Sequence, residues 1–195
     1  MDMFEGVGRR LDEKTGSLVN IGAHSLNGRE RKVLFRNNGD GTFTDVAFVN
    51  GIARLEDGRG LSLFDFDGDG RTDVLLRNYK QPTQLLHNVG PRGEWMDLKL
   101  VGTVSNRDAV GAKIRLRTKD GWQTRVVGDG SGYLSAQSLI QHFGLGSDDR
   151  ARELAIWWPS GATTRLVELE GGHRFTITEN STTPITCADP ACEQP

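Results

Sequence analysis

The chain has 195 residues, a length that allows one large domain or two small ones. Its 24 basic and 26 acidic residues give a net charge of −2, which excludes a strong general attraction to nucleic acid and a polybasic membrane anchor. No apolar run approaches the ~18 residues that span a bilayer. With 36% hydrophobic residues and 25 glycines, the composition favours a globular chain with many tight turns between short strands.

The start of the chain, residues 1–5, lacks the basic and apolar segments of a secretory signal peptide. The cysteines nevertheless favour an oxidising compartment, because Cys187 and Cys192 are separated by four residues and are suitably spaced for a small disulfide ring. A pair of free thiols and half of a metal site are the alternatives. A metal site would need two further ligands, and the sequence has no other cysteine.

Short strand-like segments follow one another from residue 32 onward, with glycine-rich turns between them. Alternation is clearest at residues 112–117, where apolar and basic side chains take turns, as in a half-buried strand. Asn-Gly and Asp-Gly pairs at residues 38–41 indicate a hairpin. The pattern predicts strands at residues 32–36, 42–46, 61–64, 74–76, 84–88, 95–100, 112–117, 123–127, 153–158, 164–169 and 174–178.

The break at residues 90–93, which reads Gly-Pro-Arg-Gly, is the best candidate domain boundary. It divides the chain into a repeat-like region at residues 1–90, a second domain at residues 91–180, and a tail at residues 181–195 that carries the cysteines. Strands spaced about 8–12 residues apart predict an antiparallel β-sandwich or barrel-like second domain. The predicted fold class is therefore all-β.

The strongest chemical feature is an acidic loop at residues 65–73. A glycine at the sixth loop position permits a sharp turn, which lets the residue at position seven offer its backbone carbonyl. Calcium takes 6–8 oxygen ligands, whereas magnesium demands tighter octahedral geometry and keeps its waters. The spacing therefore predicts a Ca²⁺ site whose ligands are Asp65, Asp67, Asp69, the Arg71 carbonyl and Asp73.

This loop differs from an EF-hand, because position twelve is Leu76 rather than glutamate and both flanks are strand-like. The prediction is a β-hairpin whose loop wraps the ion, and the alternative is a solvated Asp/Gly turn without metal. The turn at residues 38–41 has one acidic residue and is interpreted as a plain hairpin turn. His142 is interpreted as a hydrogen-bonded structural histidine beside a buried Phe143, and His87 is interpreted as structural because it shows no ligand spacing to His24 or His173.

Residues 34–46, followed by residues 60–74, resemble the FG-GAP/VCBS repeat, and residues 84–88 resemble the start of a next repeat. The second half is similar to the ASPIC/UnbV domain of the cartilage acidic protein family. That similarity rests on the segments at residues 105–112, 130–135, 142–146 and 157–161.

The resemblance implies a partial propeller-type calcium-binding hairpin repeat and transfers the metal ligands onto the loop residues named above. It also implies an extracellular, periplasmic or cell-surface module that binds a protein or glycan partner, and it carries over no catalytic residue. A closed seven-bladed propeller is excluded by the number of residues. The remaining arrangements are a fragment, blades supplied by another chain, or hairpins packed on the second domain.

The predicted function is thus a non-enzymatic, calcium-binding interaction or adhesion module without nucleic-acid binding or a membrane span. One alternative is a structural subunit that self-associates through open strand edges into a homo-oligomer or filament. The other is a carbohydrate-active enzyme with paired carboxylates. The enzyme is disfavoured because the acidic residues are already explained as metal ligands.

Overall fold

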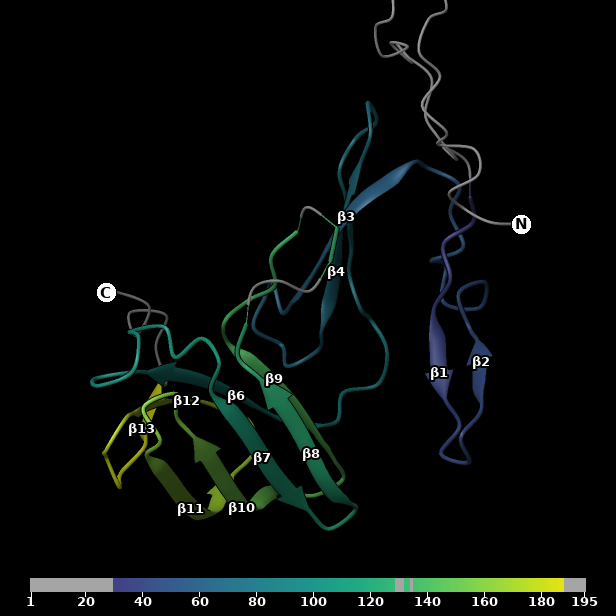
Figure 1. Ribbon diagram of the computed structural model, residues 1–195. Helices are drawn as coiled ribbons and strands as arrows, with labels where there is room; N and C mark the ends of the chain where they lie inside the picture. The colour runs from purple at the N-terminus through teal and green to yellow at the C-terminus, as the bar shows by residue number, and fades with distance from the viewer. Residues whose placement is uncertain (1–29, 129–131, 134, 188–195) are drawn as a thin grey trace, which may run out of the picture. The chain divides into compact units, whose positions relative to one another are not determined.

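The computed structural model describes residues 30–128, 132–133 and 135–187 (Figure 1). The first part of the predicted repeat region lies outside these residues, and so does Cys192 of the proposed disulfide. Thirteen strands and no helix make up the regular structure of the described residues, so the all-β prediction is confirmed. It follows that this part of the chain has no helix that could span a membrane.

The chain forms two compact units. One contains the described residues up to Gly58 together with Tyr79–Gln81, and the other contains Arg59–Asn78 and the described residues from Pro82 onward. The first unit has a two-stranded antiparallel hairpin, β1 (Phe35–Asn37) and β2 (Phe43–Asp45), with Arg36 opposite Thr44. The Asn-Gly-Asp-Gly turn joins these strands, as the sequence predicts, with Gly39 and Gly41 at positive φ.

The second unit begins with a three-stranded sheet in the order β3-β4-β5. Its strands are β3 (Gly58–Phe64), β4 (Asp73–Asn78) and β5 (Gln84–Leu86). The acidic loop connects β3 to β4. Backbone groups of β3 bond to the segment at residues 135–137: Leu61 N donates to Ser135 Oγ (3.1 Å) and Leu63 N to Gln137 Oε1 (2.9 Å). The β3–β4 hairpin is therefore hydrogen-bonded to a later segment of the same unit.

Two four-stranded sheets form a sandwich in the remainder of this unit, in the orders β11-β10-β7-β8 and β13-β12-β6-β9. No sheet of the described strands closes into a barrel. The strands are β6 (Glu94–Val101), β7 (Lys113–Thr118), β8 (Gly121–Val126), β9 (Gln141–Gly146), β10 (Arg150–Trp157), β11 (Thr163–Glu170), β12 (His173–Thr178) and β13 (Ile185–Cys187).

The core between the sheets is apolar and comes from alternating positions. Ile114 and Leu116 of β7 have no exposed surface, and they meet equally buried Met96 and Leu98 of β6 within one cluster. Burial of such side chains contributes about 25 cal/mol per Å² of apolar surface. The second sheet departs from the predicted antiparallel arrangement, because β12 runs parallel to β6. This occurs because β12 enters from β11 of the opposite sheet through a two-residue turn instead of forming a hairpin with β6.

Candidate metal centre

The acidic loop is shaped by two glycines and by carboxylates that accept backbone hydrogen bonds. Gly68 (φ 76°) and Gly70 (φ 84°) take left-handed conformations that other residues rarely adopt. The Asp65 carboxylate accepts from the N–H of Gly68 (2.8 Å), of Asp69 (3.2 Å) and of Gly70 (2.7 Å). These bonds wrap the backbone around the Asp65 carboxylate, and they orient this carboxylate without the help of an ion.

Asp73 closes the loop from its other end, at the first residue of β4. Its side chain has no exposed surface, yet both of its carboxylate oxygens have partners. Oδ2 accepts from Phe66 N (3.1 Å) and Oδ1 accepts from Asn88 N (2.7 Å). Because each carboxylate oxygen has two lone pairs, these bonds leave room for a metal ligand bond. Asp73 therefore links the loop to the chain that follows β5.

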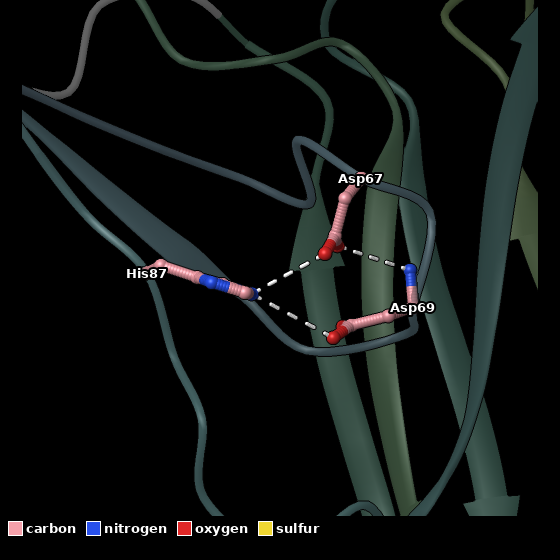
Figure 2. Close-up of side chains that lie close together, drawn as sticks. All are labelled: Asp67, Asp69 and His87. Carbon is pink, nitrogen blue, oxygen red and sulfur yellow. Dashed lines mark hydrogen bonds and ion pairs between the residues drawn. The ribbon is translucent and has the colours of Figure 1, made fainter.

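The four predicted aspartates come together in two overlapping groups. Oxygens of Asp65, Asp67 and Asp73 lie within 4.8 Å of one another. Oxygens of Asp67 and Asp69 lie within the same distance of each other and of a His87 ring nitrogen, and Figure 2 shows these three side chains converging. Asp67 belongs to both groups. The donor set is rich in carboxylate oxygens, which suits a hard cation such as calcium.

Arg71 is the only basic residue inside the loop. Its N–H donates to Asp69 Oδ1 (2.8 Å), and its guanidinium group pairs with Asp69 Oδ2 and donates to Gly90 O (3.1 Å). Burial raises the pKa of Asp69, but the hydrogen bonds and charge of Arg71 outweigh this and hold that pKa below its ordinary value. One guanidinium against four carboxylates leaves an excess of negative charge, which a divalent cation would neutralise. The role of the Arg71 carbonyl as a ligand stays a prediction.

The loop also packs on the sandwich. A Cβ atom at Gly70 would lie 2.1 Å from Nε1 of Trp95 on β6, so only glycine fits at this position. Trp95 is 8% exposed, and its indole N–H has no hydrogen-bond partner among the described residues. The sixth loop position therefore needs glycine for a second reason besides its positive φ. This close approach fixes the loop against one strand of the sandwich.

His87 is the residue that sequence reasoning did not connect to the loop. It follows β5, whose Leu86 lies opposite Val74 of β4, so the hairpin register brings His87 beside the start of β4. Its Nε2 lies 3.3 Å from Asp67 Oδ2 and 3.9 Å from Asp69 Oδ2 (Figure 2). Its ring meets the ring of Phe66 edge-on, with centroids 5.2 Å apart. The register of the β4–β5 hairpin was the signal that could have revealed it.

Comparison with known proteins gives matches in both halves of the chain. Residues 19–76 match the model of an FG-GAP-like repeat, and residues 102–184 match the ASPIC and UnbV model. Cartilage acidic protein 1 of Xenopus tropicalis is 37% identical over 118 residues, covering 57% of this chain and 18% of that protein. The human and mouse proteins of the same name are each 34% identical over 135 residues, covering 67% of this chain and 20% and 21% of theirs.

The chain thus spans about a fifth of the length of these relatives. The acidic loop falls inside the FG-GAP-like match, and most of the sandwich falls inside the second match. The resemblance found in the motifs is confirmed: the chain matches an FG-GAP-like repeat and an ASPIC and UnbV region, and it is similar to part of cartilage acidic protein 1.

Proposed function

We propose that this chain is a calcium-binding, non-enzymatic interaction module that acts outside the cytoplasm, with a protein or glycan as partner. The observation that carries the proposal is the convergence of Asp65, Asp67 and Asp73, whose oxygens lie within 4.8 Å of one another. Three carboxylates so close repel one another unless a cation lies among them. The FG-GAP-like match of residues 19–76 supports the interaction role and the location.

The ion has a structural role in this proposal. Asp65, Asp67 and Asp73 would hold it, and Asp69 and the Arg71 carbonyl would bring the ligands towards the 6–8 oxygens that calcium takes. Bound there, the ion would neutralise the loop and fix the β3–β4 turn. No step of bond chemistry is required of these carboxylates, because each has a role as a ligand or as an acceptor of backbone hydrogen bonds.

Calcium titration of the chelator-treated protein tests the proposal. We expect saturable binding by calorimetry and a melting temperature that rises with calcium and falls on adding EDTA, because a ligand of the folded state alone stabilises that state. In Asp67→Asn, affinity should fall at least tenfold, since one charged ligand is lost. Asp67 is exposed, so this variant should fold.

Asp40→Asn is the matched control, because Asp40 is an exposed aspartate in the other Asp/Gly turn. It should bind calcium like the unmodified chain. A melting curve that EDTA and calcium leave unchanged, with no heat of binding, would contradict the proposal. Equal loss of affinity in both variants would show that the effect is not specific to the loop.

A second candidate function is assembly through the β1–β2 unit. Several large apolar side chains of this unit are exposed: Phe35 by 61%, Phe43 by 63% and Phe48 by 85%. Apolar surface of this kind favours association with another chain, and short open hairpins have unpaired strand edges. Light scattering should then show a mass that grows with concentration and returns to the monomer in Phe35→Ser with Phe48→Ser. A monomer at all concentrations would remove this candidate.

A further inference from the structure

A row of three polar side chains crosses the sheet that contains β6. Asp97 of β6 lies opposite His142 of β9 and opposite Arg174 of β12 in the strand register, so the three occupy one line across neighbouring strands. Asp97 Oδ1 is 2.9 Å from His142 Nδ1. Asp97 Oδ2 accepts from Arg174 Nη2 (3.0 Å) and Nε (3.3 Å). The carboxylate therefore orients both a ring and a guanidinium group.

This row lies on the face of the sheet that points away from the sandwich core. Its neighbours Met96 and Leu98 on β6 point into the core, and side chains alternate between the faces of a strand. Asp97 is nonetheless only 3% exposed. The ring of Trp95, two residues earlier on the same face, stacks on His142 with centroids 6.1 Å apart. A buried charge on an outer face requires another element to cover it.

A cavity of about 630 Å³ lies against this row. The size is typical of sites for small organic ligands, which are clefts of ~300–1,000 Å³. One part of its wall is apolar and includes Leu61 and Leu63 of β3 together with Val126 and Ile140. Asp97, His142 and Arg174 contribute a polar part, and Arg125 of β8 lies on the wall as well.

Arg125 is the group on the cavity wall that favours an anionic ligand. Arg174 is paired with Asp97, whereas Arg125 forms no ion pair with any described residue. The guanidinium group of Arg125 donates to Thr124 O (3.0 Å) and lies 5.1 Å from the centre of the Phe143 ring. A guanidinium group held in this way presents a planar set of donors that matches a carboxylate. Asp65, the other acid on the wall, already accepts three backbone N–H groups.

We propose that this cavity binds a small organic carboxylate with an apolar body. The carboxylate group pairs with Arg125 at the polar end, beside His142 and Arg174, and the body packs on Leu61, Leu63, Val126 and Ile140. Asp97 holds His142 and Arg174 in place through its hydrogen bonds. The polar end of the cavity is therefore ordered before the ligand binds. The site goes beyond the calcium-dependent role proposed above, because none of its recognition contacts depends on the metal.

Ligand-observed NMR titration of the full chain with phenylacetate tests this site. Phenylacetate has both parts of the proposed ligand, and acetate and phenylacetamide each lack one. We expect saturable binding of phenylacetate and at least tenfold weaker binding of both comparison compounds. Arg125→Gln should weaken phenylacetate binding at least tenfold, since a charge-assisted pair is lost. Arg125 is exposed, so the substitution should not prevent folding.

Arg165→Gln is the matched control, because Arg165 is an exposed arginine of β11 that does not line the cavity. It should bind phenylacetate like the unmodified chain. Phenylacetamide binding as tightly as phenylacetate would overturn the proposal without the use of any variant. Absence of saturable binding, or equal affinity in Arg125→Gln and the unmodified chain, would overturn it as well.

Discussion

Two regions of the second unit, the surroundings of Glu179 and the acidic loop, accommodate negative charge differently. Glu179, which follows β12, is 2% exposed, and protein donors alone satisfy its carboxylate. These donors are the backbone N–H groups of Thr103 (2.8 Å), Val104 (2.8 Å) and Ser105 (2.7 Å) and the hydroxyl groups of Ser105 and Ser160. The acidic loop also uses backbone N–H groups, but it gathers four carboxylates around them.

The difference shows what distinguishes a structural acid from a candidate metal ligand. A single carboxylate with five donors is complete, and a cation would have no free position beside it. The loop gathers four carboxylates around one guanidinium group, so its negative charge remains in excess. The comparison therefore predicts that the loop depends on an ion and on tight packing, whereas Glu179 depends only on its hydrogen bonds and on remaining ionised.

The largest loss of stability is expected from Gly70→Ala, which disrupts the packing of the acidic loop against Trp95. The added Cβ would clash with Trp95 and would also take an unfavourable positive φ, so we expect a loss of about 3 kcal/mol in the free energy of unfolding. Gly68→Ala is the control, since it has the same backbone strain but nothing within 4 Å of the new atom. It should lose about 1 kcal/mol. Equal losses in urea denaturation would mean that the Trp95 contact does not matter.

The second largest loss of stability is expected from Glu179→Gln, which should leave calcium binding by the acidic loop unchanged. The amide group would turn its own donors towards some of the N–H groups that Glu179 now accepts from, leaving buried donors unsatisfied. The melting temperature should fall by several degrees, while calcium affinity stays unchanged. Glu170→Gln, an exposed acid at the end of β11, is the control and should melt like the unmodified chain. A large loss of calcium affinity in Glu179→Gln would link the two regions that the comparison separates.

Protonation of Glu179 at low pH should also remove the contribution of its carboxylate to the stability of the folded state. Burial raises the pKa of Glu179, but the bonds from Ser160 and from the backbone of Ser105, Val104 and Thr103 outweigh it and lower that pKa to about 2 from 4.5. Because the folded pKa is depressed, the stabilisation is complete above pH 4.5 and is lost as the pH falls through about 2. In urea denaturation, the stability difference between the unmodified chain and Glu179→Gln should therefore shrink over this range. A difference that is constant with pH would contradict this assignment.

The smallest effect is expected from His87→Asn. Calcium prefers oxygen ligands, so the imidazole beside Asp67 should contribute little to its binding. The exposed pairing of His87 with the loop is also weak. Calcium affinity should change less than threefold by calorimetry. A loss above tenfold, or tighter binding of zinc than of calcium, would indicate that the Asp67–Asp69–His87 group holds a different ion.

Local patterns predicted much of this molecule, because the relevant signals lie within a few residues. The regular spacing of Asp65, Asp67, Asp69 and Asp73 predicted the loop, and the alternation at residues 112–117 predicted β7, whose Ile114 and Leu116 are in the core. Trp157, which ends β10, is 36% exposed, whereas the next residue, Trp158, is 3% exposed.

Contacts between segments that are distant along the chain could not be predicted from the sequence. His142 and Arg174 lie 45 and 77 residues from Asp97 along the chain, and only the pairing of β6 with β9 and β12 aligns them. β9 itself was not predicted, because its Gly144 and Gly146 interrupt the pattern of a strand. The bonds that join β3 to Ser135 and Gln137 span 74 residues, so no local pattern reports them either.

The position of Trp95 has an optical consequence. Its indole ring touches the acidic loop at Gly70 and stacks on His142 at the cavity, so one ring contacts both candidate sites. Tryptophan emission shifts with the polarity and charge around the ring, and Trp95 is 8% exposed, whereas Trp122 and Trp157 are 45% and 36% exposed. The chain therefore contains a natural fluorophore at the junction of loop and cavity, and its emission should respond to an ion on one side and an organic anion on the other.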